Sequence, residues 1–199
     1  KIDCIKMETD SLGSLYPKID VEKCVECNAC KNVCPMCNDT DFRVNFVFPQ
    51  KTYAAWSQNK RNRENGASGG IATELYLLAL KHQYFVMGTF FDREKGVTFR
   101  EVKFEKDIEW ARDSKYVYSD MRPCFKQYRE KLNNNKKCLF IGLPCQAAAL
   151  KNYVQSLPEE KRNLLITVDL ICHGVPNFAY LDQHLTSIEK KTREKIHKI

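Results

Sequence analysis

The sequence predicts an α+β or α/β protein in which a small cysteine-rich module precedes an α/β domain with a mixed, partly parallel sheet. Two observations predict this fold class. Four cysteines lie at close, regular spacing within residues 24–34, and apolar segments alternate with helical patterns over residues 137–192. We expect the module to occupy residues 1–48 and the α/β domain residues 49–199, because a chain of 199 residues can hold both.

The cysteine run has the spacing C-x2-C-x2-C-x3-C-P, which is that of a bacterial ferredoxin binding a 4Fe-4S cluster. Three thiolates in one tight turn can reach three iron atoms of a single cube, while the fourth cysteine leaves in another direction. We therefore predict that Cys24, Cys27 and Cys30 are metal ligands of one cluster, and that Cys34 binds the same cluster or a neighbouring one. The module is then ferredoxin-like.

A zinc site is the main alternative for these cysteines. It would use Cys24 with Cys27 and Cys34 with Cys37 as two C-x2-C pairs. Only six residues separate the two pairs, which is well short of the usual zinc-ribbon interval. The spacing therefore favours an iron-sulfur cluster over zinc or a disulfide.

The cluster held by these three cysteines needs a fourth ligand, which in a two-cluster ferredoxin comes from a second motif. The sequence starts at Lys1 and has only Cys4 upstream, so we expect it to begin inside the module, with the first cysteine motif missing. Cys4 is either the last cysteine of such a motif or a packed small side chain, since Ile5 and not proline follows it. Cys37 is a further candidate ligand.

The first elements are short. We expect strands and turns around the cysteines in residues 1–40, and a connecting strand over residues 42–48 that ends at Pro49. A polar loop is predicted over residues 58–67. Apolar side chains at helical spacing then predict a helix over residues 71–81.

The middle of the chain mixes strands and helices. Two strands joined by a turn at residues 92–96 are followed by a short helix, an extended segment and a longer helix. These elements are predicted over residues 84–91, 97–104, 107–112, 115–119 and 123–132, respectively.

A strand, helix and strand pattern follows, and it is the clearest signal for a parallel sheet. Residues 137–142 and 164–172 read as buried strands, and residues 144–155 as an alanine-rich and leucine-rich helix between them. The final helix starts near Asn177. Its apolar positions recur at helical spacing, which leaves its lysines on a solvated face.

Composition limits the class of protein. Ten cysteines with ferredoxin spacing argue for a reducing compartment, so we expect the cytoplasm and not a secreted disulfide framework. The formal charge of +7 is spread along the chain, and no motif accompanies it, so we expect no nucleic-acid partner. No apolar run approaches the length of a membrane span.

One glycine-rich loop leads into a predicted helix. In Gly66-Ala67-Ser68-Gly69-Gly70 the glycines let the backbone approach a ligand closely, Ser68 is placed to cap the helix, and free N–H groups are available to a phosphate. An ordinary helix cap with a flexible lead-in explains the same residues equally well.

Two further candidates follow the parallel strands. Cys145 lies in the first turn of a helix, where the dipole lowers the pKa of a thiol, so it is a candidate to bind iron, react with a substrate or lie near a cofactor. A packed cysteine is the structural alternative. If the two strands are parallel neighbours, His173 leaves the sheet at the same edge and faces the same pocket, although a lone histidine there is usually structural.

Five motifs in this order resemble the coenzyme F420 hydrogenase/dehydrogenase beta subunit family. They are Cys24 to Pro35, Ala67-Ser68-Gly69-Gly70-Ile71, Ser114-Lys115-Tyr116-Val117-Tyr118-Ser119, Gly142-Leu143-Pro144-Cys145-Gln146 and Asp169 to Pro176. The ordered set covers nearly the whole chain and is far more specific than any single motif. Members usually continue well past the last motif, so we expect the α/β domain to be incomplete at its C-terminus.

The resemblance implies an iron-sulfur flavoprotein oxidoreductase, in which 4Fe-4S clusters, FAD and an organic substrate such as a deazaflavin exchange electrons. It implies a redox partner protein or subunit and a small-molecule substrate. It makes Cys145 and His173 candidate catalytic residues, and it makes a further set candidate cofactor-binding residues: Ser68, Gly69, Gly70, Lys115 and Tyr116. Two alternatives are an electron-transfer subunit without substrate chemistry and a non-catalytic protein with a structural metal.

Overall fold

A computed structural model describes residues 3–37 and 48–198 of the chain. Its N-terminal part is a two-stranded antiparallel hairpin, β1 (Ile5–Thr9) and β2 (Leu15–Ile19), followed by the short helix α1 (Ala29–Val33). The Asp10 carboxylate accepts hydrogen bonds from the backbone N–H groups of Leu12 and Ser14, which closes the hairpin turn. The predicted short strands and turns are confirmed. The predicted connecting strand over residues 42–48 lies, except for its last residue, outside the described residues.

The α/β domain is built on a five-stranded mixed sheet in the order β5-β4-β3-β6-β7. The strand β3 (Phe85–Asp92) pairs antiparallel with β4 (Gly96–Glu101) and parallel with β6 (Cys138–Gly142). At the two edges, β5 (Ser119–Asp120) runs parallel to β4, and β7 (Leu165–Asp169) runs parallel to β6. The predicted mixed, partly parallel sheet is therefore confirmed.

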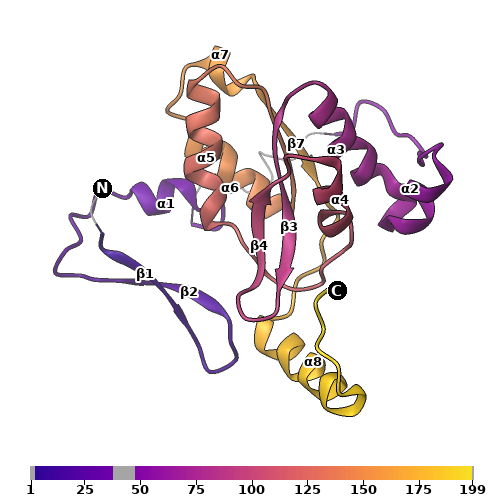
Figure 1. Cartoon of the computed structure of the whole chain (residues 1–199). Coiled ribbons are helices and arrows are strands. Elements are labelled where there is room, and N and C mark those ends of the chain that lie inside the picture. Colours follow the sequence, from indigo (N-terminus) through magenta and orange to yellow (C-terminus); the bar gives the residue numbers. More distant parts are fainter. Residues whose placement is uncertain (1–2, 38–47, 199) are drawn as a thin grey trace.

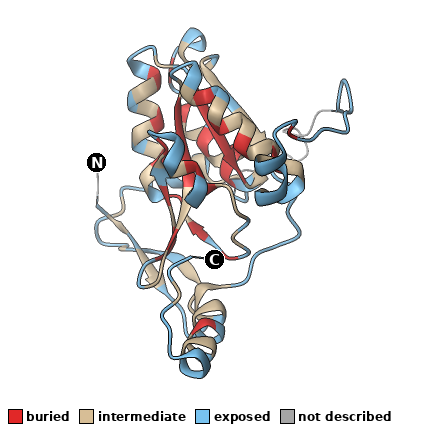
Figure 2. Ribbon diagram, turned by 45° about the vertical axis from the view of Figure 1, so that its right-hand side comes forward, coloured by how far each residue is buried: buried red, intermediate tan, exposed pale blue. Residues whose placement is uncertain are grey.

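Helices cover both faces of this sheet (Figure 1). In chain order they are α2 (Lys60–Asn65), α3 (Ile71–Lys81), α4 (Glu105–Ala111), α5 (Arg122–Asn133), α6 (Pro144–Val154), α7 (Glu159–Arg162) and α8 (Phe178–Thr192). Side chains alternate along β6, so Phe140 packs with α5 and α6 on one face, and Leu139 and Ile141 pack with α3 and α4 on the other. Figure 2 shows the buried residues gathered in the sheet and on the helix surfaces that face it.

Two predictions about local structure are wrong. The polar segment expected to be a loop contains α2, which begins where the Asn59 side chain accepts a hydrogen bond from the N–H of Asn62. The last strand stops at Asp169 rather than Cys172. It is also only partly buried, because β7 forms an edge of the sheet and its Ile166 side chain remains about half exposed.

A tyrosine ties one helix layer to the sheet. The hydroxyl of Tyr128, on α5, donates to the carbonyl of Leu139 at 2.8 Å and accepts from the N–H of Met87 at 3.2 Å. It therefore bridges β6 and β3 inside the core. Burial raises the pKa of this phenol well above its usual value, so it stays protonated and available as a donor.

The final helix packs beneath the turn between β3 and β4 (Figure 1). Its apolar positions Phe178, Leu181 and Leu185 meet a small cluster that includes Val97, which confirms the predicted apolar face. Arg93 in the turn fixes the helix with several contacts, which are ion pairs to Asp182 and Glu189 and a hydrogen bond to Thr186.

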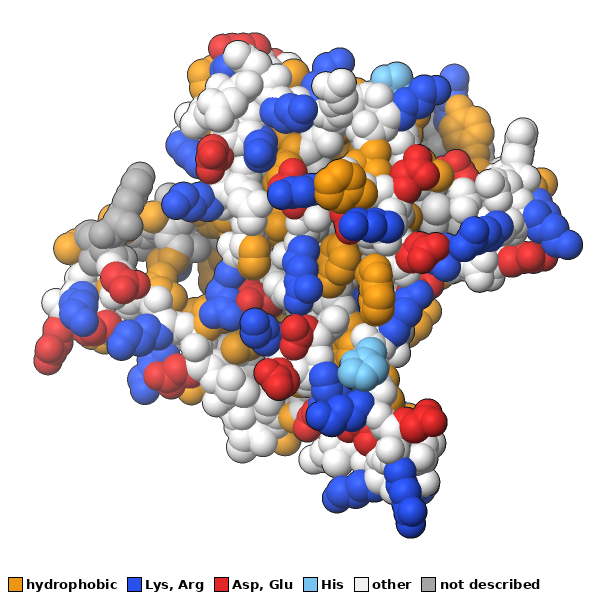
Figure 3. Space-filling model, viewed as in Figure 1, with side chains coloured by type: hydrophobic (Ala, Val, Ile, Leu, Met, Phe, Trp, Pro, Cys, Tyr) orange, Lys and Arg blue, Asp and Glu red, His pale blue; other side chains and the backbone are white. Residues whose placement is uncertain are grey.

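Charges are mixed over the surface. On the face seen in Figure 3, basic side chains alternate with acidic ones and form no single broad patch. Among the described residues, no helix is long and apolar enough to cross a membrane.

Candidate functional site

The candidate site lies at the edge of the sheet where β3, β6 and β7 end, which we call the carboxyl edge. Because Gly142 is paired with Asp169 in the parallel ladder, the loops after β6 and β7 leave the sheet side by side. These loops carry Cys145 and His173, so the prediction that both emerge at one edge is confirmed. Ligands of open α/β sheets bind at such an edge.

Cys145 lies in the first turn of α6 and has another cysteine as a neighbour. Burial raises the pKa of its thiol, the N–H of Gln146 lowers it, and the nearby Cys172 raises it again. The net pKa is raised, so the predicted lowering by the helix position is wrong. Partial burial and a second thiol outweigh the helix terminus.

Gln146 is a buried polar residue for which the sequence motifs predict no separate role. Its side-chain oxygen accepts from the N–H of Leu143, and its amide nitrogen donates to the hydroxyl of Ser119 at 3.0 Å. It therefore fixes the start of α6 against β5. The signal in the sequence is a glutamine three residues after the N-cap residue Leu143, which is the position of a capping partner.

His173 is exposed on the loop after β7. The next residue, Gly174, has φ of 117°, and a side chain there would meet nothing within 4 Å. The backbone N–H of Gly174 donates a hydrogen bond to the sulfur of Cys172 at 3.3 Å. This loop therefore presents a thiol and an imidazole on an open backbone turn.

The glycine-rich loop has an unusual backbone. Ser68, Gly69 and Gly70 have φ of 50°, 73° and 78°, so three successive residues are left-handed before α3 begins. A Cβ on Gly70 would lie 2.5 Å from the carbonyl oxygen of Asn62, so only glycine fits there. Successive N–H groups in such a turn can form an anion-binding concavity.

A short polar network supports this loop. The Glu74 carboxylate accepts hydrogen bonds from the hydroxyl of Ser57 at 2.5 Å and the amide of Asn62 at 2.9 Å, which together lower its pKa. The N–H of Ser57 in turn donates to the carbonyl of Gly69. Gly70 is the N-cap residue of α3 and no side chain caps that helix, so the expected cap by Ser68 is wrong.

The loop that carries Lys115 and Tyr116 divides its side chains between the interior and the solvent. The Lys115 ammonium donates to the carbonyls of Trp110 at 2.7 Å and Asp113 at 2.9 Å, whereas the Tyr116 side chain is 83% exposed. Burial lowers the pKa of Lys115 to about 8. Tyr116 is therefore the more accessible of the two candidates.

The low pKa of Lys115 has a measurable consequence. Between about pH 8 and its unfolded pKa of about 10.5, the folded protein binds fewer protons at Lys115 than the unfolded chain, so this group makes the folded state more stable as pH rises. Below about pH 8 Lys115 is protonated in both the folded and the unfolded state, and the destabilisation caused by burying its charge is then at its full value. We expect a lysine side-chain NMR resonance that titrates near pH 8. Lys115→Arg should remove that resonance, and its persistence would contradict the assignment.

The cysteines of the N-terminal module are free thiols and face the solvent to different degrees. Cys27, Cys30 and Cys37 are exposed, while Cys4, Cys24 and Cys34 are half-buried. Partial burial and then the neighbouring Cys24 raise the pKa of Cys4, and a hydrogen bond with Cys34 raises that of Cys37. Cys4 and Cys24 are thus neighbours of each other, and so are Cys34 and Cys37.

The cysteines that the spacing predicts as cluster ligands, Cys24, Cys27 and Cys30, alternate along the chain with two left-handed residues. Among the described residues, no three cysteine, histidine or acidic side chains gather closely enough to hold one metal ion. A cubane cluster takes one cysteine at each iron atom and so accepts ligands that are spread around it. The left-handed residues are Glu26 and Asn28, with φ of 52° and 55°.

Among the described residues, the cysteine module contacts the α/β domain at α6 and at α8. The amide of Asn152, on α6, donates to the carbonyl of Val33, on α1, at 3.3 Å. At the hairpin turn, Gly13 has φ of 81°, and a Cβ there would lie 2.5 Å from the Cβ of Ala179 on α8. The same helix, α6, therefore meets the module and carries Cys145 at the carboxyl edge.

Comparisons with known proteins agree with this architecture. Residues 135–199 match the family that describes the C terminus of the coenzyme F420 hydrogenase/dehydrogenase beta subunit, which confirms the resemblance found in the sequence. A chain of the F420-reducing [NiFe] hydrogenase complex from Methanosarcina barkeri has a similar structure, with a TM-score of 0.52 and 21% identity over 70% of this chain. The present chain spans 49% of that one. A search of curated proteins found no match.

Proposed function

On the premise that residues 135–199 belong to the coenzyme F420 hydrogenase/dehydrogenase beta subunit family, we propose that this chain is an iron-sulfur flavoprotein oxidoreductase. It would pass electrons between 4Fe-4S clusters, FAD and an organic substrate such as a deazaflavin. Electron transfer as part of a larger redox complex agrees with the structural neighbour, which comes from a multi-subunit hydrogenase. A redox partner or subunit would then supply electrons.

One observation carries this proposal. The helix α1, which holds Cys30, packs through Val33 on α6, and α6 starts with Cys145 at the carboxyl edge. The module with ferredoxin spacing thus packs on the last turn of the helix whose first turn lies at the carboxyl edge, seven residues or about 10 Å along the helix from Cys145. Such an arrangement suits a protein that moves electrons from one site to the other.

The residues present fit both cofactors. Cys24, Cys27 and Cys30 would hold a cluster, with Cys34 on the same or a neighbouring one. The left-handed turn at Ser68, Gly69 and Gly70 would receive the FAD phosphates on its N–H groups. The buried hydroxyl of Thr73 in the first turn of α3, which has no hydrogen-bond partner among the described residues, is an additional polar group near that turn.

Other side chains would complete the flavin site. The exposed ring of Tyr116 is available to stack on a cofactor, and Lys115 would hold its loop in place through the backbone carbonyls it contacts. Cys145 and His173 would lie nearest the reacting groups. When bound, the clusters would supply single electrons and the flavin would exchange them in pairs with the substrate.

Anaerobic reconstitution of the purified protein with iron, sulfide and FAD tests the proposal by absorption and EPR spectroscopy. We expect flavin bands together with a cluster signal. A cluster without flavin would indicate an electron-transfer subunit without substrate chemistry. Zinc bound in preference to iron would indicate a structural metal protein. Either of these results would contradict the proposed function.

A further inference from the structure

The chain turns back on itself after α8, and we call residues 193–198 the return segment. Arg193 has a left-handed backbone with φ of 61°, and its N–H donates to the carbonyl of Glu189 at 2.8 Å. The N–H of Ile196 donates to the Glu189 carboxylate at 3.0 Å, and the Ile196 side chain packs against the apolar cluster that contains Val117. The return segment therefore runs from α8 to the loop of residues 113–118, which we call the Lys115 loop.

The return segment meets the Lys115 loop through Lys198. The Lys198 ammonium lies 2.8 Å from a carboxylate oxygen of Asp113 and 6.0 Å from the centroid of the Trp110 ring. The backbone carbonyls of the same two residues accept hydrogen bonds from the Lys115 ammonium. Asp113 and Trp110 therefore contact both lysines, and they join the return segment to the loop.

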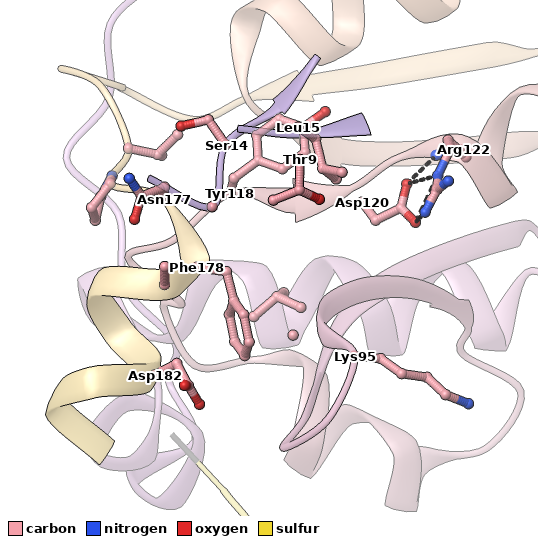
Figure 4. Close-up of a pocket in the computed structure, with 16 residues that line it drawn as sticks. Thr9, Ser14, Leu15, Lys95, Tyr118, Asp120, Arg122, Asn177, Phe178 and Asp182 are labelled. Atoms are coloured by element: carbon pink, nitrogen blue, oxygen red, sulfur yellow. Dashed lines mark hydrogen bonds and ion pairs between the residues drawn. The ribbon is translucent and has the colours of Figure 1, made fainter. Parts of the chain in front are cut away.

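The Lys115 loop also contacts other parts of the candidate site. The N–H of Tyr118 donates to the carbonyl of Pro176 at 3.3 Å, which joins this loop to the one that carries His173. Tyr118 lines a cavity of about 510 Å³ whose wall includes Phe178 (Figure 4). A displacement of the Lys115 loop would therefore move groups at the candidate site.

Three described cations share one carboxylate in this region. Besides Lys198, the Arg112 guanidinium lies 4.0 Å from the other carboxylate oxygen of Asp113, and the Lys115 ammonium lies beside the Asp113 carbonyl. Burial lowers the pKa of Lys115, the Asp113 carboxylate raises it, and the Lys198 ammonium lowers it by a smaller amount. The two partners of the ion pair therefore act on Lys115 in opposite directions.

We propose that Asp113 and Lys198 are positioning residues for Lys115, because their ion pair fastens the return segment to the Lys115 loop and sets the charge around its ammonium. This inference rests on the proposed function, in which Lys115 and Tyr116 belong to the flavin site. It adds that a segment from beyond α8 holds that part of the site in its binding conformation. Neither side chain of the ion pair needs to contact FAD, because both act through the loop.

A purely structural ion pair is the competing explanation, and it predicts a different result. The side chains of Lys198 and Asp113 are 42% and 29% exposed, and exposed pairs often contribute little to stability. If the pair only tied the segment down, removing either charge would loosen the loop, admit water to Lys115 and raise its pKa toward the ordinary value. If both charges act on Lys115, removing one lowers its pKa and removing the other raises it.

Asp113→Asn and Lys198→Gln test the inference, since each removes one charge and keeps a side chain of similar size. The NMR resonance of the Lys115 side chain is titrated in the full chain. Asp113→Asn should lower the pKa of Lys115 below about 8, because the carboxylate has the larger effect, and Lys198→Gln should raise it. Lys195→Gln is the matched control, because the charge of Lys195 acts on Glu189 and its removal should leave Lys115 unchanged.

A fluorescence titration of FAD into the reconstituted protein measures the effect on the site. The dissociation constant of FAD should rise about two- to fivefold in both Asp113→Asn and Lys198→Gln, which is the range that a partly exposed ion pair supports. A general charge effect on the anionic FAD would instead strengthen binding in the first variant and weaken it in the second. Lys198→Arg retains the ion pair and should bind FAD as the wild type does.

The proposal is overturned if Asp113→Asn raises the pKa of Lys115, or if Lys195→Gln has the same effect as Lys198→Gln. It is also overturned if FAD binding stays within about twofold of wild type in both variants. Absence of FAD from the wild-type protein would contradict the flavoprotein function, whereas the NMR titration tests the ion pair whether or not FAD binds.

Discussion

Replacing Cys27 with serine is expected to abolish the visible absorption and the EPR signal of the reconstituted cluster. Cys27 is exposed in the module and is the middle cysteine of the three that the spacing assigns to one cube. A serine hydroxyl is a much poorer ligand for iron than a thiolate. FAD content should remain that of wild type, because the candidate flavin groups belong to the α/β domain.

A cysteine in the core of the α/β domain provides the control for this variant. Cys138 is fully buried in β6, and burial raises the pKa of its thiol to about 12, so it has no thiolate to offer a metal. Cys138→Ala should therefore retain the full cluster signal per folded molecule. An unchanged cluster in Cys27→Ser, measured as iron and sulfide per protein, would disprove the ligand assignment.

Replacing Phe140 with alanine should produce the largest loss of stability, about 3–5 kcal/mol in the free energy of unfolding. Phe140 is fully buried in the interior strand β6, and its ring lies 5.6 Å from those of both Phe99 and Tyr128, centroid to centroid. Its removal leaves a cavity where two strands and α5 meet. Since domains are stable by only about 5–15 kcal/mol, this is a large share.

Urea unfolding of the purified protein, followed by circular dichroism, measures this loss. Ile166→Ala is a suitable control, because Ile166 lies in the neighbouring strand β7 with its side chain about half exposed. It should cost less than about 1 kcal/mol. Equal losses in the two variants would show that Phe140 does not lie in a tightly packed core.

The core was predictable because it depends on patterns that neighbouring residues encode. The helical spacing over residues 71–81 and the apolar run over residues 137–142 predict α3 and β6 with nearly correct limits. The strand, helix and strand order also predicts that β6 and β7 are parallel, and hence that Cys145 and His173 share an edge. The spacing of apolar residues predicts these elements correctly because it determines which face of each helix or strand is buried.

The errors came from features that depend on contacts beyond the local sequence. The segment with α2 is highly polar, so it has no apolar periodicity to reveal a helix, and its cap and the network around Glu74 stabilise it instead. The pKa of Cys145 was predicted from its helix position, but it is decided by burial and by Cys172, which comes from a different loop. Ser68 was predicted to cap α3, but that helix begins three residues later, at Ile71, and Gly70 holds its N-cap position.

The fold class, the cysteine spacing and the ordered motifs that resemble the beta subunit family are all encoded in runs of neighbouring residues. Which of those motifs meet depends on tertiary packing. Packing brings the hairpin turn at Gly13 against Ala179 in α8, from distant parts of the sequence, and leaves a cavity of about 510 Å³ beside them. The spacing of apolar residues along one segment indicates which of them are buried. A contact between distant segments depends instead on how all the intervening elements pack.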